Sequence, residues 1–329
     1  MGTFSVFGLT AVQTEILYEL ERRIIENDIR IDEKKADKKA LWLSEWVQSM
    51  DIYFRETLHI NETQLFNKCT DKELHGFIQT DNQNNVWKYM ILLECVLFPG
   101  YYPFKKEDVK RFKGLKLAKK ARHDMLEQIA DLFLEVDKKY IDIFEKAYEK
   151  SIKRMSNYWL KVGGVTLGVM ALVLIAILTF QYEILGLVAA EGTSGAALIT
   201  SGLAALGGGA IAAGGGGVAA GTAVFVGGGV LLGTAVGVPS GFVVATATNS
   251  RLFLSQAAKM EVVLKEIVLA IQKDTEYFQK VMLGLYEQSA VLTAELQKLK
   301  LEEKNNKEKI AELKKSIKYL ESVIGAVQK

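Results

Sequence analysis

Residues 193–241 read TSGAALITSGLAALGGGAIAAGGGGVAAGTAVFVGGGVLLGTAVGVPSG, and nearly every fourth position holds a very small residue. No charged residue occurs between Glu191 and Arg251. The small residues that recur at this spacing are Thr193, Ala197, Ser201, Ala205, Gly209, Ala213, Gly217, Gly221, Gly229, Gly233, Gly237 and Gly241. Residues four apart lie along one face of an α-helix, so the spacing predicts helices whose backbones approach each other closely.

The glycine content of this stretch indicates an environment other than water. A glycine inside a helix costs about 0.8–1.0 kcal/mol relative to alanine, so a helix of this composition is poor in water. In lipid the same spacing promotes helix association by van der Waals contact. We therefore expect the stretch to lie in a membrane, or to be buried in protein until it meets one. The glycines expected to make close helix contacts are Gly209, Gly217, Gly221, Gly229, Gly233 and Gly237.

A second apolar segment, Val162–Phe180, precedes the glycine-rich one and consists mostly of large aliphatic residues. A transmembrane helix needs about 20 such residues, which is close to the length of this segment. The glycine-rich segment is long enough for two further helices before Pro239 interrupts it. The residues expected to contact lipid are Leu167, Leu172, Leu174, Ile175, Ile177, Leu178, Leu203, Val224, Phe225 and Leu231.

Both flanks of the apolar block carry basic residues, which prefer the cytoplasmic side of a membrane. They are Lys146, Lys150, Lys153, Arg154 and Lys161 before the block, and Arg251, Lys259 and Lys265 after it. The two flanks are therefore expected on one side, with an even number of spans, either two or four. Tyr158, Trp159 and Tyr182 bracket the first apolar run and match an interfacial aromatic belt, although packing against a helical bundle explains them equally well.

Charged residues are concentrated outside this block. The chain has 41 Lys and Arg residues and 39 Asp and Glu residues, but only Glu183 and Glu191 lie between Val162 and Ser250. The formal net charge of +2 gives no reason to expect a nucleic-acid partner. The carboxylates of the flanks are scattered among lysines on helical faces, where we expect a solvated surface.

The flanking regions read as helices. In the N-terminal region, Leu17, Leu20, Ile24 and Ile25 recur at helical spacing, and a long helix is expected from about residue 107 or 115 to Tyr158. Residues 61–63 and 70–73 are typical of turns or helix caps, and Phe98-Pro99-Gly100 ends an apolar segment.

In the C-terminal region, a single heptad phase continues from Leu264 to Ile324, with a turn expected at Asn305-Asn306. The predicted seam contains Leu285, Leu292, Leu299, Ile310, Leu313, Ile317 and Leu320.

These patterns predict an all-α fold. It is an elongated helical bundle with a central apolar, Gly/Ala-rich transmembrane hairpin and a C-terminal coiled-coil-like helix pair. Residues 1–160 would form the N-terminal bundle, residues 161–250 the membrane-inserting region, and residues 251–329 amphipathic helices that pack on the bundle.

No pattern of catalytic, cofactor-binding or metal-binding residues is apparent, so we expect no enzyme and no cofactor. His123 and Glu127 lie one helical turn apart, but two ligands are too few for a metal site. The glycine runs lack the Lys-Ser or Lys-Thr that follows a phosphate-binding loop. Cys69 and Cys95 allow one disulfide, but two free thiols fit this chain at least as well.

The layout of long amphipathic helices around the apolar stretch Val162–Ala247 resembles the α-helical pore-forming toxins of the cytolysin A type, including the tripartite enterotoxin components of Bacillus. The resemblance implies an apolar tongue that is folded against a helical bundle, enters a bilayer and assembles into a ring. The apolar block is longer than a two-helix tongue needs. The pattern is also similar to that of apolipoprotein L, which sets a glycine-rich centre between helical arms.

These features predict a membrane-inserting, oligomerising pore former that permeabilises a bilayer, either as a toxin or as an intracellular cell-killing or defence effector. Its expected partners are the lipid bilayer and copies of itself, with a second type of subunit as a further option. No cleavable signal peptide is expected, because the start MGTFSVFGL lacks a basic region. A cytoplasmic or released soluble form would then convert to a membrane-bound form. The alternative is a constitutive membrane scaffold whose helical arms recruit a partner.

Overall fold

The computed structural model describes residues 9–56, 60–80, 85–102, 108–160, 258–259, 261–301 and 303–328. These residues form helices and their connections, and no β-strand occurs among them, so the predicted all-α class is confirmed for these ranges of the chain. They divide into two units, with the boundary between Glu145 and Lys146 inside helix α7.

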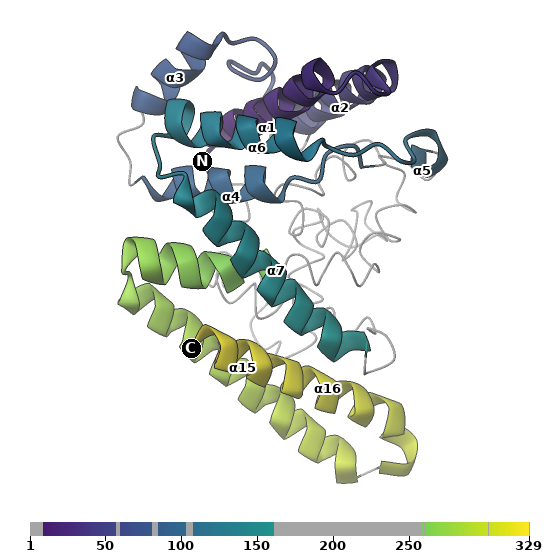
Figure 1. Ribbon diagram of the computed structural model, residues 1–329. Helices are drawn as coiled ribbons and strands as arrows, with labels where there is room; N and C mark the ends of the chain where they lie inside the picture. The colour runs from purple at the N-terminus through teal and green to yellow at the C-terminus, as the bar shows by residue number, and fades with distance from the viewer. Residues whose placement is uncertain are drawn as a thin grey trace. The chain divides into compact units, whose positions relative to one another are not determined.

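The first unit is built around α1 (Ala11–Ile31), which packs against α2 (Ala36–Glu56), α4 (Val86–Leu97) and α6 (Lys119–Gln128) (Figure 1). A capping box starts α1: the hydroxyl of Thr10 accepts the Gln13 N–H at 3.2 Å, and the Gln13 side chain accepts the Thr10 N–H at 2.9 Å. The predicted apolar positions of α1 are fully or almost fully buried. The 3.6-residue spacing of these side chains therefore fixes which face of α1 enters the core.

Aromatic side chains from α1 and α2 fill the centre of this unit. Trp42 and Trp46 of α2 stack with ring centroids 6.0 Å apart, and Tyr18 of α1 meets Trp46 and Phe54 edge-on. Burying each such side chain contributes about 1.5–3 kcal/mol. Both indole N–H groups are satisfied, because Trp42 donates to the Tyr102 carbonyl at 2.7 Å and Trp46 to the Tyr102 hydroxyl at 2.8 Å.

Several carboxylates expected on the surface are instead buried: Glu15, Glu19, Glu21 and Asp28 on α1. The expectation of a solvated surface is wrong for these four residues, and backbone N–H groups explain how at least two of them are accommodated. Glu15 accepts the N–H groups of Gln64 and Leu65, each at 2.8 Å, and Asp28 accepts the Ala118 N–H at 2.7 Å. Their charges hold the loops to α1 and satisfy donors that would otherwise be buried without a partner.

Two of the sequence signals for caps and breaks in this unit are confirmed. The hydroxyl of Thr70 accepts the Glu73 N–H at 3.3 Å, and the Glu73 carboxylate accepts the Thr70 N–H at 2.8 Å, so α3 (Asp71–Thr80) begins with a capping box. Helix α4 ends at Leu97, directly before Phe98-Pro99. Both signals depend on local backbone chemistry and not on distant packing.

The single long helix expected from residue 107 or 115 to Tyr158 is wrong. The chain instead forms α5 (Asp108–Arg111), α6, a π-helical turn η1 (Ile129–Leu134) and α7 (Lys139–Leu160). Gly114 has φ +78°, and Glu135 has φ +52°, so both residues leave the right-handed helical region. The apolar stripe continues across the two breaks because α6 and α7 both bury apolar side chains, and periodicity alone does not reveal a break of this kind.

The second unit contains α7 from Lys146 onward, the π-helix η4 (Val263–Gln272), α15 (Thr275–Leu301) and α16 (Glu303–Val327). Helices α15 and α16 run antiparallel (Figure 1). The side-chain amide of Gln328 donates a hydrogen bond to the Tyr286 hydroxyl at 2.6 Å. The continuous heptad helix from Leu264 is wrong, because Lys273 has φ +57° and ends η4. The turn expected at Asn305-Asn306 is also wrong, because α16 already begins at Glu303 and includes both asparagines.

No helix in the described ranges combines the length and the hydropathy that a membrane span requires. The predicted membrane-inserting region, 161–250, lies outside the described residues.

Candidate functional site

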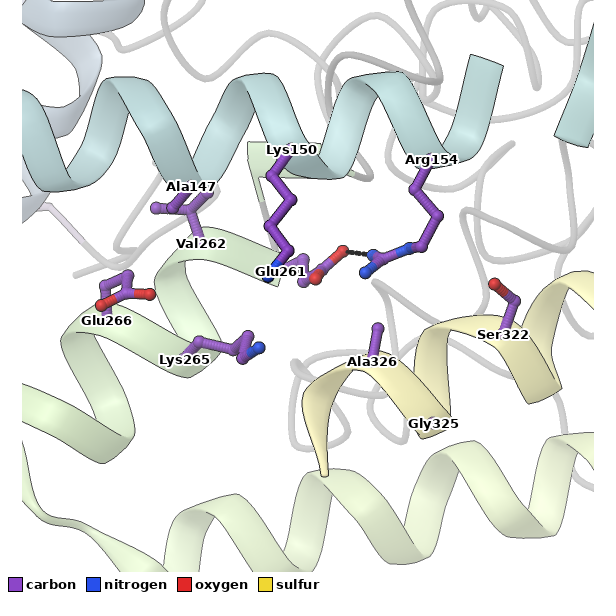
Figure 2. Close-up of a pocket in the computed structure, with 10 residues that line it drawn as sticks. All are labelled: Ala147, Lys150, Arg154, Glu261, Val262, Lys265, Glu266, Ser322, Gly325 and Ala326. Carbon is purple, nitrogen blue, oxygen red and sulfur yellow. Dashed lines mark hydrogen bonds and ion pairs between the residues drawn. The ribbon is translucent and has the colours of Figure 1, made fainter. Parts of the chain in front are cut away.

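In the second unit, α7 lies beside the chain that leads into η4, and the two are joined by a buried cluster of polar side chains. Arg154 of α7 forms an ion pair with Glu261, which also accepts a hydrogen bond from the Ser151 hydroxyl at 2.6 Å (Figure 2). The side chain of Glu261 is 6% exposed, and that of Arg154 is 33% exposed. One Glu261 oxygen, Oε2, accepts from both partners.

Burial makes this contact specific. A carboxylate taken out of water loses hydration free energy, and only paired charges and hydrogen bonds compensate for that loss. Arg154 supplies the charge and Ser151 a neutral donor. Removal of either the guanidinium or the carboxylate would leave the other charge poorly compensated. The cluster therefore favours one relative position of α7 and the chain that leads into η4.

A cavity of about 600 Å³ lies beside this ion pair, within the second unit. Three elements supply its walls: α7, η4 with the residues before it, and the last turns of α16 (Figure 2). The lining residues are Ala147, Lys150, Arg154, Glu261, Val262, Lys265, Glu266, Ser322, Gly325 and Ala326.

The cavity has cationic walls. Lys150, Arg154 and Lys265 line it, together with the carboxylates of Glu261 and Glu266. Arg154 is engaged with Glu261, whereas Lys150 and Lys265 form no ion pair with any residue that the structure describes. Figure 2 shows the Lys150 side chain directed from α7 toward the ribbon at Glu261, and the Lys265 ammonium on the side that faces Ala326.

Small residues keep the α16 wall open. Gly325 and Ala326 occupy the last turn of α16, and Ser322 lies one turn earlier. A Cβ atom built on Gly325 meets no atom within 4 Å, so the space in front of this residue is empty. A larger residue at position 325 would therefore project into the cavity without straining the backbone.

Most of the residues selected from the sequence lie outside the described residues. These are all ten predicted lipid-contact residues, Leu167, Leu172, Leu174, Ile175, Ile177, Leu178, Leu203, Val224, Phe225 and Leu231; all six predicted contact glycines, Gly209, Gly217, Gly221, Gly229, Gly233 and Gly237; and Tyr182. The other two aromatic residues, Tyr158 and Trp159, belong to the last turn of α7.

The structure places the predicted seam residues on α15 and α16. Leu285, Leu292, Ile310 and Leu320 are buried, and Leu299, Leu313 and Ile317 are half-buried. One apolar cluster contains Leu285, Leu292 and Leu320, with Leu313 and Ile317 packed against it. This cluster also includes Leu264 of η4, which connects the helix pair to the element that lines the cavity.

The histidines and cysteines form no comparable site in the ranges that the structure describes. His75 lies 3.5 Å from Glu135, and His123 lies 3.9 Å from Glu127, in each case between exposed side chains. Within the same ranges, no three His, Cys, Asp or Glu residues are grouped to hold a metal ion. Cys69 and Cys95 are free thiols, and burial raises the pKa of Cys95 well above its ordinary value.

The sequence contained one signal for the cavity. Lys150, Arg154 and Lys265 all belong to the basic flanks of the apolar block. Their spacing along the chain did not reveal that α7 and η4, whose contacting residues are more than 100 positions apart, bring them to one cavity, nor that the end of α16 closes it.

Comparison with known proteins yields no match, whether to a family model, to a curated protein or to a solved structure.

Proposed function

We propose that this protein inserts residues 161–250 into a lipid bilayer, assembles with copies of itself and permeabilises the membrane. The observation that carries the proposal is the contact between Arg154 and Glu261, which joins the described segment before the apolar block to the described segment after it. A block whose two flanking segments are joined in this way returns to its starting side. It is therefore suited to cross a membrane an even number of times, as a hairpin.

The basic flanks agree with this topology. Lys150 and Arg154 precede the block, Lys265 follows it, and all three line one cavity. Cationic residues next to apolar segments favour the cytoplasmic side of a membrane. Their common location supports a single side for both flanks.

The glycine pattern supports assembly. Gly217, Gly221, Gly229, Gly233 and Gly237 recur at multiples of four residues in an uncharged stretch. Segments rich in Gly and Ala bury little apolar area, so they gain less from lipid than leucine-rich segments do. Close packing between small residues provides the remaining stabilisation, and it favours contact between helices.

The likeness of the layout to the cytolysin A type suggests how the conversion would proceed: a soluble form exposes its apolar block on contact with a membrane, and copies of the inserted form then assemble. Toxin and intracellular cell-killing or defence effector are the two roles that fit this behaviour. A second type of subunit would fit the tripartite enterotoxins.

One observation favours a second candidate function, a membrane scaffold that recruits a partner. On α15, Leu283 is 59% exposed and Tyr286 is 47% exposed, so this helix offers apolar surface to another protein. Fractionation separates the two functions: the pore former has a form that stays in buffer without detergent, and the scaffold is always in the membrane fraction.

Dye release from vesicles tests the main proposal. Purified protein is added in buffer to phospholipid vesicles that contain a self-quenched dye, and release is followed with time. We expect the rate of dye release to increase more than linearly with protein concentration, because several copies form each pore. A protein that binds vesicles but releases no dye at any concentration would contradict it.

A further inference from the structure

We propose that the cavity between α7, η4 and α16 binds the phosphate group of an anionic phospholipid. This inference rests on the proposed function, because only an inserted apolar block brings the cavity to the headgroup layer. The inference specifies which class of lipid the protein binds and where it binds, whereas the proposed function requires only a bilayer with an apolar interior.

The charges in the cavity favour an anion. Lys150 and Lys265 reach the cavity from two different elements and have no ion-pair partner among the described residues. Two like charges that face one space raise each other's electrostatic energy, and an anion between them lowers it. Ammonium groups on flexible side chains are common phosphate ligands because they act as point charges.

The other polar groups complete a set suited to phosphate. The guanidinium of Arg154 lines the same cavity while it pairs with Glu261, and the hydroxyl of Ser322 is available as a neutral donor on the α16 side. Glu266 also lines the cavity and opposes an anion. The charged residues that line the cavity are three cations, Lys150, Arg154 and Lys265, and two carboxylates, Glu261 and Glu266. The net charge of the lining is therefore positive.

The shape of the cavity fits a headgroup with part of its glycerol. Ala147, Val262 and Ala326 give apolar surface beside the cations, and Gly325 leaves space where any other residue would place a side chain. A volume of about 600 Å³ exceeds what a bare phosphate needs. An amphipathic cavity of this kind suits an anionic group that is covalently joined to a less polar one.

The positions of the cavity residues along the chain indicate that the phosphate belongs to a lipid. Arg154 lies seven residues before the predicted membrane-inserting region, 161–250, and Glu261 lies eleven residues after it. If the block enters a bilayer, residues this close to both of its ends reach the headgroup layer. Basic groups on the cytoplasmic side of spanning segments bind anionic headgroups in this layer.

The test measures how strongly the full-length protein prefers anionic vesicles. Flotation is compared for phosphatidylcholine vesicles and for phosphatidylcholine vesicles that contain phosphatidylglycerol. Gly325→Leu fills the cavity without changing any charge, and Gly325→Ala is its matched control, because a Cβ at this position meets nothing within 4 Å. We expect Gly325→Ala to keep the preference for phosphatidylglycerol and Gly325→Leu to lose it.

A second set of variants keeps the inference testable if Gly325→Leu perturbs the helix. The double variant Lys150→Gln/Lys265→Gln removes the two unpaired cations. Lys314→Gln/Lys318→Gln removes the same charge from exposed positions of α16 that do not line the cavity. We expect the preference for phosphatidylglycerol to fall at least tenfold in Lys150→Gln/Lys265→Gln, on the order of the effect of two basic residues at an anionic surface. In Lys314→Gln/Lys318→Gln the loss should be much smaller. Glu266→Gln should strengthen the preference.

The outcomes are distinct. If Gly325→Leu and Lys150→Gln/Lys265→Gln prefer phosphatidylglycerol as the unmodified chain does, the inference is overturned. Inorganic phosphate that binds the unmodified chain but not Gly325→Leu, combined with vesicle binding that ignores lipid charge, would assign the cavity to a soluble phosphate compound and overturn the lipid assignment.

Dye release, measured in the same samples, separates this inference from the proposed function. Release that persists while all variants prefer phosphatidylglycerol equally would overturn the inference alone. A preference that depends on the cavity, without any release, would overturn only the pore.

Discussion

Arg154 and Glu261 form a largely buried ion pair between residues that are 107 positions apart in the sequence. The apolar block lies between them in the chain, so the pair joins the segment that precedes the block to the segment that follows it. Ser151, one helical turn before Arg154, donates to the same Glu261 oxygen at 2.6 Å. The two flanks of the block are thus held within one packed unit.

A double-mutant cycle on Arg154→Met and Glu261→Met should reveal strong coupling. Each single change leaves a charge without its partner, so each should lower the free energy of unfolding by about 1.5–3 kcal/mol, and the double variant should recover some of that loss. Urea denaturation provides the measurement. The matched control is the exposed pair Lys138–Asp131, whose nitrogen and oxygen lie 2.6 Å apart and whose coupling should be much weaker because solvent screens it. Equal coupling in the two pairs would show that burial contributes nothing.

Substitution of the predicted contact glycines should separate assembly from folding. Gly229→Leu or Gly233→Leu should abolish the oligomer and the release of dye, because a leucine keeps two backbones apart. Gly76→Leu on α3 is the control, since a Cβ at Gly76 meets no atom within 4 Å. Cross-linking on vesicles and dye release are the measurements, with circular dichroism as the check on folding. Undiminished release from Gly229→Leu would refute the role of the glycine face.

Two glycines of the first unit should respond to alanine in opposite directions. Gly100 has φ +57°, and its added Cβ would lie 2.9 Å from Cγ of Leu117 and 3.1 Å from Cδ1 of Ile25. Gly100→Ala should therefore destabilise the unit by about 1–3 kcal/mol through backbone strain and overpacking. Gly76→Ala should stabilise α3 by up to about 1 kcal/mol, because alanine is the better helix former. Urea midpoints of the two variants should move apart, and a shift in the same direction would contradict this account.

Stability should fall at alkaline pH because of Tyr101. Burial, then the hydrogen bond to Asp28, raises the pKa of this phenol well above its ordinary value. Above about pH 10 the unfolded chain releases the phenolic proton while the folded protein keeps it, so the free energy of unfolding decreases as pH rises. Urea denaturation at a series of pH values should show this decrease, with a smaller slope in Tyr101→Phe. An identical slope in the variant would mean that Tyr101 does not cause it.

Local sequence patterns predicted three features of the first unit: the buried face of α1, the cap of α3 and the end of α4. The spacing of Leu17, Leu20 and Ile24 was sufficient to identify the buried face of α1, because helical geometry alone places these side chains together. The Thr70 capping box and the break before Pro99 were equally local. Features of this kind depend on residues within one or two helical turns.

Distant packing accounts for what the sequence did not reveal. Glu15 looks like a surface residue until the loop at Gln64–Leu65 delivers backbone N–H groups to it. The left-handed residues Glu135 and Lys273 interrupt helices without a glycine or proline to announce the break. The cavity likewise needs three separate elements, so the basic flanks indicated its cations but neither its location nor its walls.

The most direct test of the central claim is the environment of residue 174 when vesicles are added. A single cysteine is introduced as Leu174→Cys in a chain with Cys69→Ser and Cys95→Ala, and it is labelled with an environment-sensitive fluorophore. Lys318→Cys, at an exposed position of α16, is the matched control. The account predicts a blue shift at residue 174 and quenching by nitroxide placed in the lipid acyl chains, with neither effect at residue 318. A probe at residue 174 whose emission stays unchanged when vesicles bind would contradict it.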